Sequence, residues 1–179
     1  MGFPKALLPY REETFLDTLC GLFATRCSPV IVVLGAGAAE IRARATRPAT
    51  FVVNQDYRRG QTSSMQCGLR AVPPDAGGVL FTLVDHPAVS PETIAALCGG
   101  ANEAAALLRV PRDRGQRGHP VWFSRELIPE FLALPEDGAA RDVVRRHARD
   151  TEFLDLDDPG ILADIDDPEA YRNLTGASV

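Results

Sequence analysis

Several acidic residues of this sequence stand where carboxylates could bind a metal ion. Asp85 directly follows the apolar run 78–84, and Asp164 and Asp166 lie close together just before Pro168. Mg²⁺ takes few protein oxygen ligands and keeps phosphate and water for its other positions. Crowded carboxylates without a basic partner repel one another, and a shared cation relieves that repulsion. The pattern predicts a metal site at Asp85, completed by one of the later carboxylates.

The same residues also have purely structural interpretations. An Asp before X-Pro, as in Asp85-His86-Pro87, is common in turns. Acidic residues at 164–167 could stabilise the N-terminus of a helix beginning near Pro168. His86 could be a ligand, an acid/base group or a turn histidine. The residue pattern alone leaves these alternatives open.

A second group of polar residues lies in the segment 54–68. Asn54 ends an apolar stretch, Gly60 allows an unusual turn, and Ser63 and Ser64 stand where a helix begins. Hydroxyls and backbone N–H groups at a helix N-terminus can bind an anion or a base edge. A capped surface helix without a ligand explains the pattern equally well. Lys5, taken in isolation, is only an exposed lysine.

Other familiar site patterns are missing from the sequence. The nucleophile motif GxSxG is absent, so Ser63 or Ser64 with His119 does not make a convincing triad. Neither GxxxxGK[ST] nor GxGxxG occurs, because the turn 35–37 lacks the third glycine. There is no CxxC, and the four cysteines are expected to be buried free thiols, which suits a reducing compartment.

The candidate residues must be positioned by a sheet, and the chain alternates between strand-like and helix-like segments. We expect a doubly wound, mainly parallel α/β sheet with helices on both faces, in which ligands bind at the carboxyl ends of the strands. The run 30–34, rich in β-branched residues, predicts a strand buried on both faces. The expected strands are 30–34, 50–54, 78–84, 104–110, 118–124 and 153–155, and the expected helices are 14–24, 38–45, 63–71, 90 onward, 125–134, 139–149 and 168–174.

Composition limits the class of protein. Of 179 residues, 45% are hydrophobic and 24% charged, which predicts one globular domain over 1–179. A net charge of −5 argues against nucleic acid or anionic membrane as a partner. The short basic runs 112–117 and 141–146 are expected on helix surfaces or in contact with small anions. No secretory signal or spanning segment is present, so we expect a cytoplasmic protein.

Taken in order, these segments resemble the nucleotidyltransferases of the molybdenum-cofactor group, which include molybdopterin cytidylyl- and guanylyltransferases. The resemblance covers nearly the whole chain, and its strength lies in the order of six individually weak matches. The matching segments are 1–10 (family LAAGxSxRMGxPK-LLP), 14–16, 54–68, 84–87 (family DxP), 118–121 (family G-[HN]-P) and 164–169 (family DIDTPED).

The resemblance implies a Mg²⁺-dependent enzyme that transfers a nucleoside monophosphate from CTP or GTP to a molybdopterin-type or related phosphorylated acceptor. Asp85 and Asp166 would bind the metal, with Asp164 close by, and Lys5 would contact the nucleotide phosphates. The last motif and the 118–121 segment resemble the cytidylyl-type members, which favours CTP.

The resemblance also assigns residues to the pocket. Gly2, Asn54, Ser63 and Ser64 would help to shape the pocket for the nucleotide and the acceptor, and His119 would lie near the acceptor.

The chain departs from the family pattern at its start, inside the first motif. The family's first strand and its Gly-rich phosphate loop precede the equivalent of Met1, and the strand normally lies in the middle of the sheet. Its loss would leave unpaired edges, which are costly for buried backbone groups. We expect that the chain begins late; the alternative is a catalytically impaired paralogue that acts as a nucleotide- or cofactor-binding or regulatory module.

Overall fold

The computed structural model describes residues 4–99, 106–135 and 137–176. The helices are α1 (Phe15–Ala24), α2 (Ala38–Arg44), α3 (Gln61–Leu69), α4 (Pro91–Cys98), α5 (Ile128–Leu132), α6 (Ala140–Arg146) and α7 (Pro168–Thr175). The strands are β1 (Pro9–Tyr10), β2 (Glu13–Thr14), β3 (Ile31–Leu34), β4 (Thr50–Val53), β5 (Gly78–Phe81), β6 (Leu108–Asp113), β7 (Gln116–Arg117), β8 (Val121–Ser124) and β9 (Thr151–Asp155). Short 3₁₀ turns are η1 (Lys5–Leu7), η2 (Tyr57–Arg59), η3 (Arg125–Leu127), η4 (Ala148–Asp150) and η5 (Pro159–Leu162).

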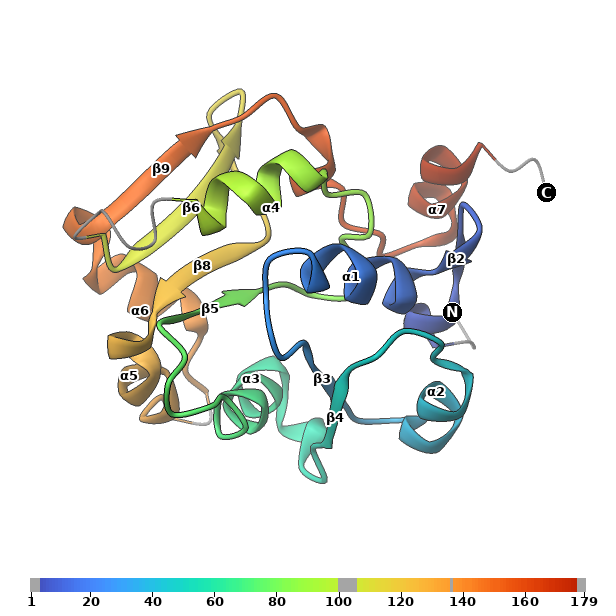
Figure 1. Ribbon diagram of the computed structural model, residues 1–179, viewed down its shortest axis with the longest axis horizontal. Helices are drawn as coiled ribbons and strands as arrows, with labels where there is room; N and C mark the ends of the chain where they lie inside the picture. The colour runs from blue at the N-terminus through green and yellow to red at the C-terminus, as the bar shows by residue number, and fades with distance from the viewer. Residues whose placement is uncertain (1–3, 100–105, 136, 177–179) are drawn as a thin grey trace.

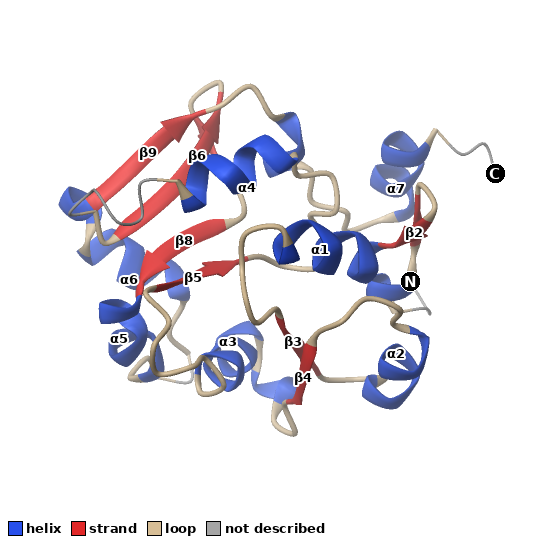
Figure 2. Ribbon diagram, viewed as in Figure 1, coloured by secondary structure: helices blue, strands red, loops and turns tan. Residues whose placement is uncertain are grey.

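The larger sheet has five strands, with β8 between β5 and β6. Because β8 is antiparallel to both neighbours, β5 and β6 run in the same direction, and β9 pairs parallel with β6. β3 and β4 form a separate parallel pair, which lies apart from the other strands in Figure 2. The expected α/β class is therefore confirmed, with β8 as an antiparallel strand that the sequence pattern did not reveal.

Helices cover both faces of the larger sheet, as expected. Alternate residues of β5 point to opposite faces: Val79 and Phe81 pack against the cluster formed by α3, α5 and α6, while Leu80 packs against the cluster of α1 and α4. Figure 1 shows α4 and α1 on one side of β5 and β8, with α3 and α5 on the other. No helix in the described ranges is long and apolar enough to cross a bilayer.

A groove of about 540 Å³ separates the two sheets. Its walls include β3, β5, α1 and α3, and apolar side chains such as Val32, Leu80 and Leu19 line it. Among the residues that the structure describes, no strand pairs with the free edge of β3 or with that of β5. As a result Ile31, Val32 and Val33 are only half-buried, and the expectation of a strand buried on both faces was wrong.

β5 is shorter than expected and ends at Phe81, so Asp85 does not follow the strand directly. Phe81 pairs with Val121, the first residue of β8. The residue before that strand, Pro120, has no N–H group with which to continue the pairing beyond Phe81. The chain from Thr82 therefore leaves the sheet, and Asp85 lies in a turn beyond its end.

Other boundaries moved for similar local reasons. The strand expected at 104–110 lies at Leu108–Asp113, and the first two of its expected residues are outside the described ranges. The helix expected at 125–134 is a 3₁₀ turn followed by the short α5, and the one expected at 139–149 ends at Arg146. The side chains of Thr14 and Ser90 cap α1 and α4 by accepting hydrogen bonds from backbone N–H groups.

The cysteines carry no disulfide, as expected, although only Cys20 is buried and the other three are half-buried.

The N-terminus of α1 is fixed by the buried carboxylate of Asp17, which is 3% exposed. It accepts hydrogen bonds from the backbone N–H groups of Thr46 (2.8 Å) and Arg47 (2.9 Å) and from the Thr14 hydroxyl (2.9 Å). Burial opposes the charge on Asp17, but these hydrogen bonds outweigh it and hold the pKa below its ordinary value. Asp17 thereby fastens α1 to the segment that leads into β4.

Replacing Asp17 with Ala should lower the free energy of unfolding by roughly 1–2 kcal/mol, because the partly buried hydrogen bonds from the backbone N–H groups of Thr46 and Arg47 lose their acceptor. A depressed folded-state pKa contributes stability above the unfolded-state value, and that contribution is lost as pH falls through the folded-state pKa. In urea unfolding, the difference in the free energy of unfolding between the parent protein and Asp17→Ala should therefore be larger at pH 7 than at pH 3. Asp75→Ala, at an exposed position, is the matched control. Equal effects of the two substitutions would contradict this account.

Candidate active site

The turn after β5 and the C-terminal segment meet through one backbone hydrogen bond. The N–H of Ile165 donates to the carbonyl of Asp85 at 3.0 Å. Ile165 itself is buried in the cluster formed with Tyr10 and Phe15. This bond holds Asp164 and Asp166, on either side of Ile165, beside Asp85 although about eighty residues separate them in the sequence.

The C-terminal segment is positioned by a second buried carboxylate, Asp158. Its Oδ2 atom accepts from the backbone N–H of Ser90 (2.9 Å) and the hydroxyl of Thr93 (2.6 Å), and its Oδ1 atom accepts from the N–H of Gly160 (3.0 Å). A Cβ atom at Gly160 would lie 2.1 Å from the carbonyl oxygen of Ala88, so only glycine allows this approach. Asp158 therefore ties the segment to the start of α4, just after the Asp85 turn.

Lys5 is the cation of this carboxylate group. Its Nζ atom lies 2.5 Å from Oδ1 of Asp166 and 3.6 Å from Oδ2 of Asp85. Partial burial opposes its charge, but the hydrogen bond to Asp166 and the charge of Asp85 raise the pKa of Lys5 above its ordinary value. The hydrogen bond from Lys5 lowers the pKa of Asp166 in turn.

Asp164 has the opposite environment. Burial, followed by the charges of Asp85 and Asp166, raises the pKa of Asp164 above its ordinary value, and His86 and Lys5 offset only part of this. The group thus has more negative charge than Lys5 neutralises.

Three side chains of the group have the geometry of a cation site. One potential ligand atom each from Asp85, His86 and Asp164 lies within 4.8 Å of the other two. His86 is 6% exposed, and its Nδ1 atom and Oδ1 of Asp85 are buried without a hydrogen-bond partner in the described structure. Buried polar atoms are almost always satisfied. These orphaned acceptors fit a divalent cation, since two carboxylates and an imidazole are ordinary ligands for one.

His119 joins the group through His86. The two rings are 5.0 Å apart, and the ring of Phe81 lies 6.2 Å from that of His119. Burial, and then the neighbouring His86, lower the pKa of His119, so its imidazole is neutral at pH 7. A Cβ atom at Gly118 would lie 2.3 Å from the carbonyl oxygen of Ile161, which shows how closely this loop packs on the C-terminal segment.

Asn54, Ser63 and Ser64 form a separate group at the end of β4. The amide of buried Asn54 donates to the hydroxyls of Ser63 (2.9 Å) and Ser64 (3.1 Å), and its oxygen accepts from the N–H of Asp56 (3.0 Å). Ser63 also donates to the carbonyl of Gly60. These bonds fold the loop back onto the start of α3, and Ser64 lines the groove between the sheets.

The structure thus brings together Lys5, Asp85 and Asp166 with His119 alongside, whereas no described contact joins them to the Asn54 group. Gly2 lies outside the described residues. Sequence reasoning left His86 open between a ligand, an acid/base group and a turn histidine, and the structure places it beside Asp85 and Asp164. Its only signal was that it directly follows Asp85.

Comparison with known proteins gives the family. Residues 1–151 match the MobA-like NTP transferase domain. The nicotine blue oxidoreductase of Paenarthrobacter nicotinovorans is 34% identical over 180 residues, which cover 96% of this chain and 87% of that protein. The molybdenum cofactor cytidylyltransferase of Escherichia coli K12 is 25% identical over 173 residues, which cover 96% of this chain and 86% of that protein.

Similar solved structures support the same family assignment. The crystal structure of Rv0371c from Mycobacterium tuberculosis H37Rv superimposes with a TM-score of 0.86 at 31% identity, covering 99% of this chain and 91% of that one. A complex of the same protein with manganese gives a TM-score of 0.83 at 30% identity, covering 98% and 94%. The chain therefore belongs to the MobA-like NTP transferase family of nucleotidyltransferases.

Proposed function

We propose that this protein transfers a nucleoside monophosphate from CTP, or less readily GTP, to a molybdopterin-type or related phosphorylated acceptor, with Mg²⁺ as its metal. An oxygen of the acceptor phosphate bonds to the α-phosphorus, the bond from that phosphorus to the bridging oxygen breaks, and pyrophosphate leaves. The observation that carries the proposal is the group of Asp85, Asp164 and Asp166 around Lys5. Phosphoryl transfer needs mainly positioning and charge, which such a group provides.

Asp85 and Asp164 are the residues that we expect to bind the metal, with His86 as a third ligand. A bound divalent cation would neutralise the charge that develops on the phosphates. Asp166 is the ligand that the family resemblance implied, and its carboxylate accepts a hydrogen bond from Lys5. We infer that a triphosphate takes the place of Asp166 at Lys5, which frees Asp166 to approach the metal.

Lys5 then stabilises the negative charge of the leaving pyrophosphate. The raised pKa of Lys5 means that its ammonium group is charged at neutral pH. The neutral imidazole of His119 lies beside the metal group and can hydrogen-bond to the acceptor without adding charge.

The name of one relative, nicotine blue oxidoreductase, suggests a redox activity as an alternative. The residues of this chain favour nucleotidyl transfer. Dinucleotide sites of the Rossmann type place a GxGxxG loop against the pyrophosphate, and that motif does not occur in the sequence. The carboxylate group matches the needs of a metal-bound triphosphate and has no role in hydride transfer.

One structural feature bears on the second candidate, a nucleotide- or cofactor-binding module. Among the described residues, the edges of β3 and β5 that border the groove are unpaired. We propose that an apolar strand can pair with these two edges. Pro4 lies near Gly37, just beyond the end of β3, and Lys5 lies beside Asp85. A strand in the groove that runs parallel to β3 would end next to this point.

Metal binding can be tested without catalysis. Mg²⁺ or Mn²⁺ should raise the Tm of the protein by mass action, and Asp85→Asn should abolish that shift. Asp164→Asn should raise the Tm at pH 7 in the absence of metal. A carboxyl whose pKa is raised in the folded state destabilises it once ionised, and this effect disappears as pH falls below the unfolded-state value. Asp75→Asn is the control, and an equal metal shift in Asp85→Asn would refute the site.

Activity is tested by pyrophosphate release. With CTP or GTP, Mg²⁺ and molybdopterin, a chain extended ahead of Met1 should release pyrophosphate, faster with CTP. Asp85→Ala and Lys5→Met should each lower kcat roughly 10²–10³-fold, the usual effect of losing one charge-stabilising group. The absence of release, or full activity in Asp85→Ala, would exclude the enzyme and favour the binding module.

The groove is tested by hydrogen exchange. Fusing the N-terminal segment of the E. coli cytidylyltransferase to Met1 should slow exchange of the amides in 31–34 and 78–81 and raise the Tm. A Gly/Ser extension of equal length is the control, because it adds chain but no apolar strand. Unchanged exchange at these amides would mean that no strand occupies the groove.

A further inference from the structure

The C-terminal ends of α1 and α4 bring two cysteines together. Cys27 follows α1, and its backbone N–H donates to the carbonyl of Phe23 at 2.8 Å. Cys98 is the last residue of α4, and its side chain packs against the cluster that contains Leu19 and Phe23 of α1. The Cys27 thiol donates a hydrogen bond to the sulfur of Cys98. The fold therefore holds two thiols in direct contact, although they lie far apart in the sequence.

Both thiols can be reached from solvent. Cys27 and Cys98 are half-buried and line the groove between the sheets. Arg26 and Ser28, on either side of Cys27, line the same groove and are exposed. Cys20, in contrast, is buried, and burial raises its pKa to about 11. A small molecule can thus reach the pair, whereas Cys20 is a protonated core thiol.

The charges around the pair make Cys98 the more reactive sulfur. Arg109 is 2% exposed, and its Nη1 atom donates to the backbone carbonyls of the residues before and after Cys98. The hydrogen bond from Cys27 lowers the pKa of Cys98, although partial burial opposes it, and the same bond raises the pKa of Cys27. The charges of Arg26 and Arg109 lower the pKa of Cys98 further. Reactive cysteines have such electropositive, partly exposed surroundings.

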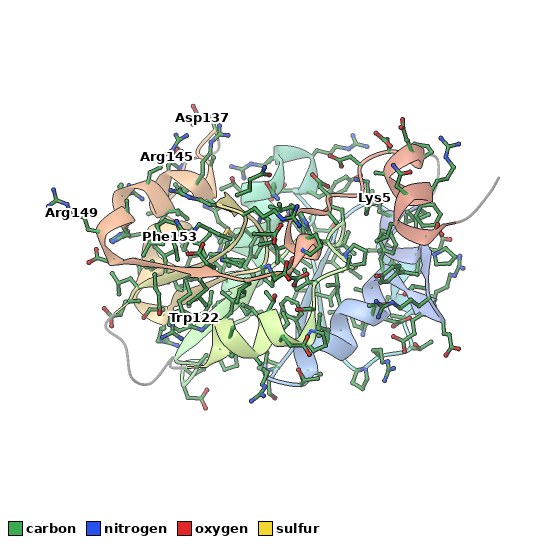
Figure 3. The ribbon with its side chains drawn as sticks, turned by 90° about the horizontal axis from the view of Figure 1, so that it is seen from above. Lys5, Trp122, Asp137, Arg145, Arg149 and Phe153 are labelled. Carbon is green, nitrogen blue, oxygen red and sulfur yellow. The ribbon has the colours of Figure 1, made fainter. Side chains whose placement is uncertain are left out.

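The pair is separate from the carboxylate group. Cys27 leads into the start of β3, whereas Pro4, next to Lys5, lies near the turn beyond the end of that strand. The guanidinium of Arg109 lies 5.1 Å from the ring of Trp122, and Figure 3 shows Trp122 well apart from Lys5. The two thiols therefore have no part in the proposed transfer reaction.

We propose that Cys27 and Cys98 are a redox-active pair, which closes to a reversible disulfide by exchange with a small-molecule disulfide of the glutathione type. The proposal is carried by the direct contact of the two thiols at an accessible part of the groove, beside the charges of Arg26 and Arg109. Where thiols are otherwise kept reduced, disulfides are usually transient ones of this kind.

The exchange has two steps. The Cys98 thiolate attacks one sulfur of glutathione disulfide, so that the S–S bond of the reagent breaks, a mixed disulfide forms at Cys98 and one glutathione thiolate leaves. Cys27 then loses its proton, and its sulfur attacks that of Cys98, which releases the second glutathione thiolate. The protons of the two cysteines end on the two glutathione thiolates. The pair is thus oxidised by two electrons, and the reagent is reduced to two thiols.

The disulfide would fasten the end of α4 to the segment that leads into β3. It closes the loop between Cys27 and Cys98, which restricts the unfolded chain and so stabilises the folded one. We expect the oxidised protein to have a Tm roughly 5–10 °C above that of the reduced protein.

The test is a redox titration of the full chain at pH 7, in buffers with varied ratios of reduced to oxidised glutathione. Peptide mass spectrometry, after alkylation of the remaining thiols, should find Cys27 linked to Cys98 as the oxidised fraction rises. Dithiothreitol should reverse both the link and the rise in Tm. The matched control is Cys67→Ser, which removes another half-buried thiol, on α3, and should form the same link as the parent.

Single variants separate the roles of the two sulfurs. Cys27→Ser should accumulate glutathione on Cys98, because the second step is blocked. Cys98→Ser should add glutathione to Cys27 at least about tenfold more slowly, because the pKa of Cys27 is not lowered. If a serine variant is unstable, Cys27→Ala and Cys98→Ala give the same comparison.

Two outcomes would overturn the proposal. If the native protein links Cys20 or Cys67 instead, or links Cys27 to Cys98 only in urea, the pair is not a redox site of the folded protein. Equal rates of glutathione addition in the two single variants would show that Cys98 is not the attacking thiolate.

Discussion

The site depends on a charge imbalance held in place by the backbone. The hydrogen bond from Ile165 to the carbonyl of Asp85 places Asp164 and Asp166 beside Asp85, where Lys5 is the cation that contacts them. Burial, and then the like charges of Asp85 and Asp166, raise the pKa of Asp164, and the fold opposes that repulsion with the buried cluster around Ile165 and with the bonds of Asp158. A protein gains nothing in stability from such an arrangement. The arrangement makes sense if a bound cation and a triphosphate reduce the repulsion between these carboxylates during function.

The sequence predicted much of this site, and the reasons differ between residues. Asp85 follows an apolar run, so its position near a sheet end could be inferred from periodicity alone. Lys5 and Asp166 had no such signal, because an ammonium near the start of the chain and a carboxylate 161 residues later meet only in three dimensions. The ordered motifs of the family implied that both residues belong to one nucleotide site, Lys5 at the phosphates and Asp166 at the metal. They did not imply the direct contact between the two, which the structure shows. The alternatives for His86 could not be decided from the sequence, since its burial and its unpartnered Nδ1 atom are properties of packing.

The fold was predictable at the level of class but not of pairing. Alternating apolar runs indicated an α/β sheet, whereas the antiparallel direction of β8 depends on which strands it joins. The early end of β5 follows from Pro120 in the neighbouring strand, so no inspection of the run 78–84 by itself could show it.

The groove and the charged group are connected by geometry. Lys5 belongs to η1, directly after Pro4, and its backbone is fixed mainly by Leu7 and Ala6 in the cluster beneath α1 and α2. A strand between β3 and β5 would pair both free edges and lead into this segment, so it would restrict Lys5 as well as complete the sheet. The same strand would separate the carboxylate group from the apolar groove, which now lies open between the sheets. Stability of the sheet and precision at the phosphate-binding side of the site would then have one physical origin.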